Sequence, residues 1–460
     1  MNILFFFVIT QLYNYNSYDF IEYTEQVLRT KQNINLLSIK PLNYFYDTHQ
    51  YLGYNFSTAF RTYLDNDVFL AQLDFQFMEK NLHMNIEGVL KAGDSTSSLY
   101  PTRKWNDKAA SDYTRAFVAY GNKKVGLMLG REKLTIGPSP RYNALLSGYA
   151  PSMDGLFYWY RNKFFNIYFW GAKLETSLQK KLEYVGDTIT EVIRASRYFS
   201  LHRIETAIWQ NFSLGFQEVV LYGGENRDFE PHYFNPLVLY YVYQFNRSTD
   251  DNYFWDFDVK CYLGNVYLYA EAMFDDFQYA EDPQGEPNHY VLNLGSMIID
   301  PVGNKNSMLF VEYTRASRWV YNHFVPWQRY TYLGFPIGHP YGCSFDDFYM
   351  LYRIKLLKNL DLYSSLEYRR KGVTEIDTPW PVPEPRSVDP EAKFPSNNFL
   401  SGVVEKMYKF EERIKFKIKQ WNVDLSVGLE MYKNYKHEEN NNCKNLVFSI
   451  YLKRDYSLKF

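Results

Sequence analysis

The sequence is poor in cysteine and has no long apolar run. Its 460 residues include only 3 cysteines, too few and too scattered for a disulfide framework or a zinc site, which leaves room for one disulfide at most. The longest apolar stretch is ILFFFVI at 3–9, far short of the ~20 residues that a membrane-spanning helix needs. A bundle of transmembrane helices is therefore excluded.

An excess of basic residues and the common catalytic motifs are also missing. The formal net charge is −2, so no basic surface points to nucleic acid as a partner. The chain has no G-x-S-x-G, H-E-x-x-H, Walker or dinucleotide-binding motif. We therefore expect neither an enzyme nor a cofactor.

The apolar stretch lies where the core of an export signal would be. No Lys or Arg precedes it, because Arg29 is the first basic residue, and no A-x-A-like cleavage site follows it. Residues 1–16 are therefore assigned only as a candidate signal segment.

Two acidic pairs, Asp250–Asp251 and Asp275–Asp276, are the sequence features nearest to a cation site. Neighbouring side chains on a strand point to opposite faces, so the carboxylates of each pair would diverge. Solvated loops account better for both pairs, and the sequence predicts no metal site.

From about residue 55 onward the dominant pattern is alternation. AQLDFQFME (71–79) places Leu73 and Phe75 on one face, with Asp74 between them on the other. The pattern continues to the last residue, Phe460. Segments of about ten residues match the length of a tilted membrane-spanning strand. The same alternation recurs in NLHMNIEGVL (81–90), IKFKIK (414–419) and VDLSVGLEM (423–431).

The connections between these segments are of two kinds. Short polar turns with hairpin chemistry fall at 79–81, 121–124, 161–163, 209–211, 263–265, 301–306, 357–359 and 420–422. Long stretches rich in Tyr, Pro, Asp and Gly lie between them, at 133–154, 175–197, 225–252, 316–345 and 371–402. Short turns at one end and long loops at the other are typical of an outer-membrane barrel.

Counting strands from these turns gives the fold. The turns join about sixteen strands, one more at 55–64 precedes them, and a last strand ends at Phe460, which makes an even number. We predict an all-β transmembrane barrel of about 18 antiparallel strands over 51–460, in the bacterial outer membrane, with both termini on the periplasmic side. A closing strand with a terminal aromatic resembles the signal read by outer-membrane insertion machinery, so this machinery and outer-membrane lipid are expected partners.

A short amphipathic segment precedes the barrel. In DFIEYTEQVLRT (19–30), Phe20, Tyr23, Val27 and Leu28 have helical spacing. We predict a helix there, within a periplasmic segment at 17–50, and no other convincing helix.

The main alternative fold is a soluble all-β protein such as a propeller, a sandwich or a secreted barrel. No internal repeat at propeller period is present, and the aromatic content of 19% suits the two interfaces of a bilayer.

In HRIE (202–205), Arg203 and Glu205 share one face of a strand. Their spacing indicates a charge pair in the lumen rather than a catalytic pair.

The long loops carry the densest mixture of aromatic and polar side chains. Sugar rings present apolar C–H faces and hydroxyl edges, which aromatic rings beside Asn, Asp, Glu, Arg and His match. The alternative is that these rings sit in the interface belt or pack the loops together. The richest stretches lie at 134–154, 221–237 and 311–342.

Several separated motifs resemble the capsule-assembly outer-membrane family of Wzi type. They are GREKLTIGPSPRYNALLSGYAPSMD (130–154), HRIETAIWQNFSLGFQEVVLYGGENRDFEPHYFNPL (202–237), DDF (275–277), EYTRASRWVYNHF and YTYLGFPIGHPYG (312–342). The resemblance implies an eighteen-stranded barrel with a small helical periplasmic part and a lectin-like, non-catalytic role with surface polysaccharide. The chain departs from the family's Trp-Gly-Pro-Gly at Ile136, Gly137, Pro138 and Ser139.

We therefore expect a barrel that binds, anchors or organises capsular polysaccharide or exopolysaccharide. The alternative function is a porin or a saccharide-specific diffusion channel. The residues predicted to contact polysaccharide or to order the loops are Arg131, Asp154, Tyr222, Glu225, Arg227, Asn235, Glu312, Arg315, Tyr321, His323, Tyr330 and His339.

Overall fold

The structure is a computed structural model of the chain. It describes residues 17–29, 39–40, 51–62, 67–92, 109–122, 124–182, 189–209, 211–247, 249, 251–277, 284–383, 389–395 and 399–459. The candidate signal segment at 1–16 and the terminal Phe460 lie outside the described residues.

Long antiparallel strands make up most of the structure. The first half of the chain supplies β2 (Tyr51–Thr62), β3 (Asp67–Glu79), β4 (Leu82–Ala92), β5 (Ala109–Gly121), β6 (Val125–Glu132), β8 (Met153–Arg161), β9 (Phe165–Lys173), β11 (Ile189–Trp209) and β12 (Phe212–Glu225). The second half supplies β13 (Asn252–Leu263), β14 (Val266–Asp276), β15 (His289–Ile299), β16 (Ser307–Ala316), β19 (Phe345–Leu357), β20 (Leu360–Lys371), β21 (Glu405–Ile418), β22 (Trp421–Lys433) and β23 (Cys443–Lys459).

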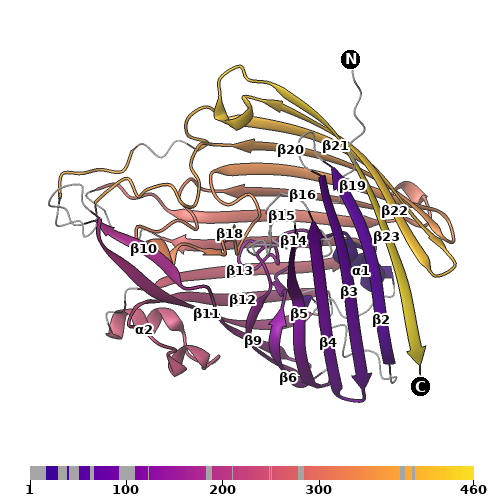
Figure 1. Ribbon diagram of the computed structural model, residues 1–460, viewed down its shortest axis with the longest axis horizontal. Helices are drawn as coiled ribbons and strands as arrows, with labels where there is room; N and C mark the ends of the chain where they lie inside the picture. The colour runs from indigo at the N-terminus through magenta and orange to yellow at the C-terminus, as the bar shows by residue number, and fades with distance from the viewer. Residues whose placement is uncertain are drawn as a thin grey trace.

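The strand pairings run once around the molecule and return to their start (Figure 1). Strand β2 pairs with β3 and also with the last strand, β23, from Tyr51↔Lys459 to Arg61↔Ser449. Of the 19 strands in this sheet, β10 (Ser177–Leu182) only extends the sheet beside the first part of β11, so the other eighteen form the closed ring. The predicted antiparallel barrel is confirmed.

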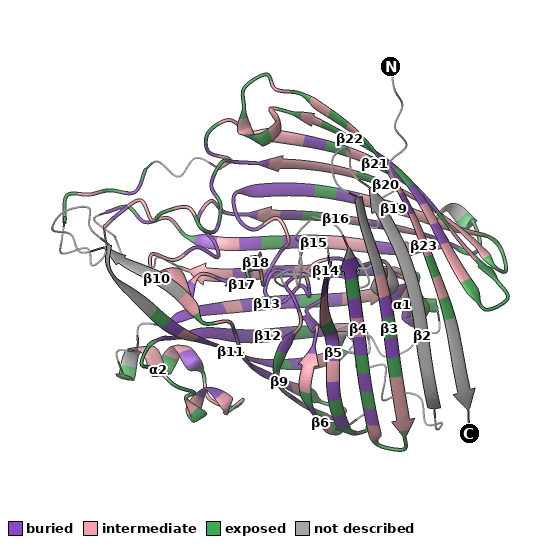
Figure 2. Ribbon diagram, viewed as in Figure 1, coloured by how far each residue is buried: buried purple, intermediate pink, exposed green. Residues whose placement is uncertain are grey.

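Exposure alternates along the strands, with apolar side chains on the outside. Leu73 and Phe75 of β3 are 45% and 50% exposed, whereas Asp74 between them is 6% exposed. In β4, the exposed Ile86 follows the fully buried Asn85. Figure 2 shows this alternation along β3 and β4. An apolar outer band around a polar lumen is the arrangement that a barrel needs in a bilayer.

The two ends of the barrel differ in the way the sequence predicts. The short turns expected from the sequence join neighbouring strands at one end, and the long connections gather at the other. The stretch at 175–197 is an exception, because β10 and the first residues of β11 form a projecting hairpin there. Ile189, Thr190 and Val192 are β-branched residues that favour a strand over a loop.

The three cysteines are free thiols.

The N-terminal helix docks at the short-turn end. Helix α1 (Ser17–Arg29) buries Ile21, Val27 and Leu28 against inward-facing residues of β14, β15, β16, β19 and β20. The predicted helix is confirmed. A second helix, α2 (Tyr240–Arg247), lies at the opposite end, at the left of Figure 1, so the expectation of no further helix is wrong. Among the described residues, no helix has the length and apolar composition needed to cross a membrane.

Two long connections turn inward and fill the middle of the barrel. We call residues 133–152 the plug loop and residues 317–344 the outer loop. Ile136, Leu145 and Ile337 are fully buried and belong to one apolar cluster with inward-facing residues of the barrel wall. Strand β7 (Thr135–Ile136) of the plug loop pairs with β1 (Ile39–Lys40). The lumen is therefore packed, and the plug loop is part of its core.

Candidate functional site

One arginine fastens the plug loop to the barrel wall. The buried Arg141 donates from Nη1 to Asp347 of β19 at 2.5 Å, and its Nη2 lies 3.2 Å from a carboxylate oxygen of Glu367 in β20. Its guanidinium carbon lies 4.0 Å from the ring centroid of Tyr349. Burial alone would lower the pKa of Arg141, but Asp347 and Glu367 outweigh it and hold this pKa well above its usual value. Arg141 is thus a permanent cation inside the lumen.

The departure from the family motif lies beside this arginine. The hydroxyl of Ser139 donates to Glu312 of β16 and accepts hydrogen bonds from the backbone N–H groups of Arg141 at 3.0 Å and Tyr142 at 3.1 Å. Gly137 has a φ of +139°, which a residue with a side chain rarely adopts. The motif therefore keeps the glycine that the turn requires and gains a hydroxyl that bonds to the wall.

The outer loop lies directly on the plug loop. The hydroxyl of Tyr321 donates to the carbonyl of Ala144, and that of Tyr330 donates to the carbonyl of Leu145 at 2.8 Å. The two tyrosine rings stack with their centroids 5.5 Å apart. Both rings are fully buried, so they join the two loops and do not face solvent.

A second arginine holds the other side of the outer loop. Arg197 of β11 donates to three backbone carbonyls, those of Trp327 at 2.7 Å and of Arg329 and Thr331 at 2.8 Å. The remaining nitrogen pairs with Glu175 at 2.7 Å. Two of the three guanidinium nitrogens therefore fix the backbone of the outer loop, and the third pairs with a carboxylate.

A buried carboxylate explains why helix α2 forms. Glu218 of β12 accepts the backbone N–H groups of Tyr240 at 2.6 Å and Tyr241 at 2.9 Å, and the indole N–H of Trp255 at 2.8 Å. Helix α2 begins at Tyr240, so Glu218 satisfies N–H groups that the first turn of a helix leaves unpaired. The partner lies 22 residues earlier in the chain, where local sequence analysis does not look.

The lumenal charge pair expected in HRIE is present and belongs to a larger network. Arg203 lies 3.0 Å from Glu205 and 2.5 Å from Asp258, and Lys260 lies 3.2 Å from Glu205. The four side chains are almost completely buried. Two cations and two carboxylates balance in charge, so this network is a structural element of the wall.

One cavity at the loop end combines aromatic and polar groups. We call it the Trp380 cavity. It has a volume of about 320 Å³ and is lined by Tyr241, Gln244, Asp251, Asn252, Tyr253, Asp275, Asp276, Glu286, His289, Asn322, His323, Phe324 and Trp380. The ring of Trp380 contacts His289, with centroids 5.9 Å apart, and Phe394, at 5.3 Å. Aromatic walls beside amide, carboxylate and imidazole groups have the chemistry that a sugar ring requires.

A second cavity lies on the other side of the outer loop. Its volume is about 450 Å³, and Arg197, Arg329, Tyr341, Glu375 and Asp377 are among the residues that line it. Pro326, Pro336 and Pro340 of the outer loop form one wall of this cavity. The outer loop therefore separates two cavities at the loop end.

Five of the predicted site residues are buried in the loop packing. The imidazole of His339 is buried, and its Nδ1 accepts the N–H of Tyr341 at 3.3 Å. Burial, followed by the charges of Arg141 and two residues of β20, keeps the pKa of His339 well below 6.5. The five buried residues are Tyr222, Glu312, Tyr321, Tyr330 and His339.

The other predicted residues lie nearer to solvent. Arg131 and Asp154 form a rim ion pair at 2.5 Å with side chains 27% and 58% exposed. Arg227 bridges Asp251 and Glu230, each at 2.5 Å. The remaining four are Glu225 and Asn235, which are exposed, Arg315, whose guanidinium lies 3.8 Å from the ring centroid of Phe399, and His323, which lines the Trp380 cavity.

The structure brings some predicted residues together and leaves others apart. Arg131 meets Asp154, and Tyr321 meets both Tyr330 and the backbone of His339. These two groups and the exposed residues do not form one continuous site.

Sequence analysis missed the residues that organise the loops. Arg141 and Glu218 lie within the quoted family motifs, but neither was among the predicted site residues, and Arg197 and Trp380 lie outside those motifs. Arg141 and its partner Asp347 are 206 residues apart. The detectable signal was a single charged residue close to an apolar stretch, in SPRYNALL at 139–146.

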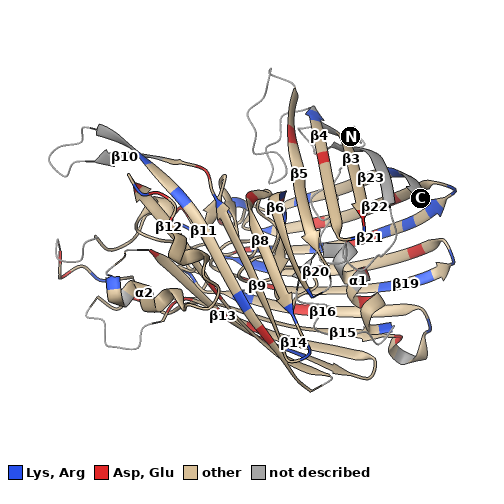
Figure 3. Ribbon diagram, turned by 90° about the horizontal axis from the view of Figure 1, so that it is seen from below, with Lys and Arg blue, Asp and Glu red and all other residues tan. Residues whose placement is uncertain are grey.

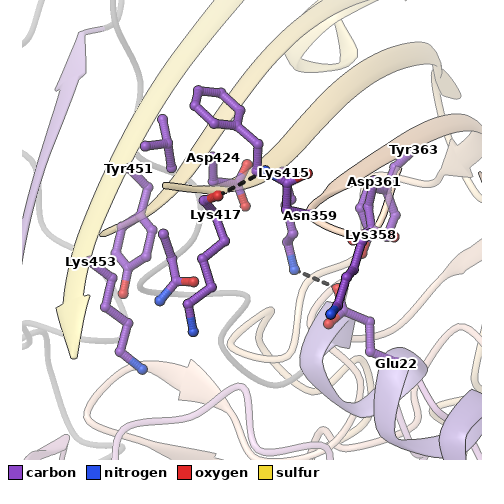
Figure 4. Close-up of a pocket in the computed structure, with 13 residues that line it drawn as sticks. Glu22, Lys358, Asn359, Asp361, Tyr363, Lys415, Lys417, Asp424, Tyr451 and Lys453 are labelled. Carbon is purple, nitrogen blue, oxygen red and sulfur yellow. Dashed lines mark hydrogen bonds and ion pairs between the residues drawn. The ribbon is translucent and has the colours of Figure 1, made fainter. Parts of the chain in front are cut away.

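A third cavity lies at the short-turn end, beside α1. Its volume is about 380 Å³, and Figure 4 shows Glu22 of α1 and Lys415 reaching each other across it, 2.6 Å apart. Lys358 and Lys417 add positive charge at the turn tips, where Figure 3 shows basic residues beside β19 and β21. Burial would raise the pKa of Glu22, but Lys415 outweighs it and lowers this pKa. The cavity is thus part of the docking site of α1.

One comparison with known proteins identifies the family, and another supports the barrel fold. A profile of the family described as capsule assembly protein Wzi matches residues 45–446. Wzi of Escherichia coli, an outer-membrane protein involved in group 1 capsule assembly and a carbohydrate-binding β-barrel, is 13% identical, with a TM-score of 0.59 over 91% of this chain and 86% of that chain. OccD3 (OpdP) of Pseudomonas aeruginosa is 8% identical, with a TM-score of 0.49 over 89% of this chain and 91% of that chain. No curated protein sequence matches significantly.

The closed ring of strands, the apolar outer band and the profile match agree with one another. The protein is a β-barrel of the bacterial outer membrane. The chain belongs to the capsule assembly protein Wzi family.

Proposed function

We propose that this barrel binds and organises surface polysaccharide at its loop end, without catalysing a reaction. The family to which it belongs supports a role in capsule assembly. The observation that carries the proposal is the Trp380 cavity, because it places aromatic rings beside polar groups at the end of the barrel that bears the long loops.

Within this proposal the predicted residues have two roles. Buried residues such as Tyr321 and Tyr330 order the loops, because their hydroxyl groups donate hydrogen bonds to backbone carbonyls of the plug loop. His323 and Trp380 contact the saccharide, since both line the cavity. The ring of Trp380 offers a sugar an apolar face at the wall of the cavity.

Binding can be measured with the detergent-purified barrel and polysaccharide extracted from the surface of the bacterium that encodes it. Trp380→Ala and His323→Ala should each weaken binding about fivefold, because each removes a stacking or hydrogen-bonding contact of roughly 1 kcal/mol. The matched control is Asp228→Asn, an exposed carboxylate of the same barrel end outside the cavity. Equal binding by all these variants, with unchanged heat-resistant mobility on gels, would contradict the proposal.

The channel alternative has a direct test. The plug loop, the outer loop and α1 occupy the lumen at successive levels. We therefore expect the barrel to be silent in a planar lipid bilayer. A steady open current would favour a diffusion channel instead.

A further inference from the structure

Three side chains with metal-binding groups meet in the wall of the Trp380 cavity. Asp276, Glu286 and His289 each offer one ligand atom, and these atoms lie within 4.8 Å of one another. Asp276 and His289 are cross-strand partners at the loop end of β14 and β15, so the backbone fixes their separation. Glu286 belongs to the segment that leads into β15. All three side chains line the cavity.

The imidazole of His289 provides the second observation. The side chain is 2% exposed, and its Nε2 is buried without a hydrogen-bond partner in the described ranges. A buried imidazole nitrogen that lacks a partner costs about 1–3 kcal/mol. A cation at this position would remove that cost, because neutral imidazole is a good ligand for divalent metals.

We propose that Asp276, Glu286 and His289 form a divalent cation site. Two carboxylates and one imidazole suit the borderline ion Zn²⁺ better than Mg²⁺ or Mn²⁺, which are harder ions that favour oxygen ligands. Ligands of one such ion lie about 3–4 Å apart, so small side-chain rotations bring the three atoms into range. Three protein ligands leave at least one position for water on the cavity side.

The proposed site differs from a cation site built on the acidic pairs Asp250–Asp251 and Asp275–Asp276. Asp275 accepts the backbone N–H of Tyr321 at 2.5 Å, and Asp251 pairs with Arg227, so both of these carboxylates already have structural roles. Asp276 lines the cavity together with Glu286 and His289. The cluster joins a carboxylate at the end of one strand to a histidine at the start of the next.

The site has a structural consequence for the loop between β14 and β15. A bound cation would tie the end of β14 to residues 286–289 on the other side of this connection. It would also place a positive charge in the wall of the Trp380 cavity. Neither consequence depends on whether the cavity binds polysaccharide.

Metal binding can be measured on the full-length protein in detergent, after treatment with chelator. Isothermal titration with Zn²⁺ should give one saturable site per chain, and the same titration with Mn²⁺ should show weaker binding. Asp276→Asn, Glu286→Gln and His289→Gln should each weaken binding by at least about tenfold. Asp228→Asn should bind as the unchanged protein does.

Hydrogen exchange provides a second readout that does not need a complete binding curve. Saturating Zn²⁺ should slow amide exchange in residues 284–289 of the unchanged protein and leave the His289→Gln variant unaffected. Heat-resistant gel mobility identifies variants that still form the barrel. Absence of binding, or binding that all three substitutions leave unchanged, would overturn the proposal.

Discussion

The two ends of the barrel are closed in different ways. At the short-turn end, α1 is a separate N-terminal element, and its ion pair between Arg29 and Asp300, at 2.9 Å, remains partly accessible. At the loop end, the plug loop and the outer loop are connections between strands of the barrel itself. Several of their polar contacts are buried, as in Arg141 with Asp347.

This difference predicts unequal stabilities. Exposed ion pairs contribute little, because water and salt screen them. A buried charge that loses its partner is far more costly, because the remaining charge stays desolvated. The loop end should therefore be the rigid end of the barrel, and the helix end should respond to salt.

The largest effect is expected for Arg141→Ala. The substitution leaves the buried carboxylates of Asp347 and Glu367 without their cation, which should destabilise the barrel by about 3–5 kcal/mol. The temperature at which heat-resistant gel mobility is lost measures this effect. Arg131→Ala, which breaks the rim ion pair, is the control and should cost about 1 kcal/mol or less. If both variants lowered this temperature equally, the expected difference between buried and accessible ion pairs would be wrong.

The next effect depends on pH. Burial holds the pKa of His339 below its ordinary value of 6.5, so the folded loop binds a proton less readily than the unfolded chain does. The neutral imidazole therefore contributes its full stabilisation above about pH 6.5, the pKa of the unfolded chain. This contribution declines as the pH falls below 6.5. Amide exchange in the outer loop, corrected for intrinsic rates, should be faster at about pH 5 than at about pH 7.5. His339→Gln should weaken this dependence, and an unchanged dependence would assign it to another group.

A smaller loss is expected for Tyr330→Phe. It removes the hydroxyl that donates to Leu145 and retains the stacked ring, which should cost about 0.5–1.5 kcal/mol. Faster amide exchange at 144–146 would report the loosened plug loop. Equal exchange in the two proteins would show that the hydroxyl does not hold it.

The smallest effect belongs to the helix end. Arg29→Ala removes the pairs with Asp300 and Glu25 and should cost about 0.2–1 kcal/mol. Protease cleavage within α1 should become faster in the variant at low salt. At about 1 M salt the two proteins should converge, because the pairs are already screened. A salt-independent difference would mean that packing, not charge, holds the helix.

The barrel was predictable from the sequence because its rules are local. Alternation in AQLDFQFME decides which side chains face lipid, and the short turns decide which strands are neighbours. The packing of the loops was not predictable in this way. Arg141 and Asp347, or Arg197 and the carbonyl of Trp327, meet only after the ring has closed. Helix α2 was missed for the same reason, since Glu218, which accepts its first N–H groups, lies on a strand.

The pairing of β2 with β23 has a consequence for how the molecule is made. These strands lie at opposite ends of the barrel sequence. The pairing between them is therefore the last one that can form as the chain is synthesised. Until it forms, the sheet has two open edges with unpaired backbone groups, which lipid cannot satisfy. The plug loop belongs to a connection far from both edges and contacts walls on several sides. Pairing β2 with β23 and packing the interior are therefore one event, and a chain that lacks β23 would fail at both.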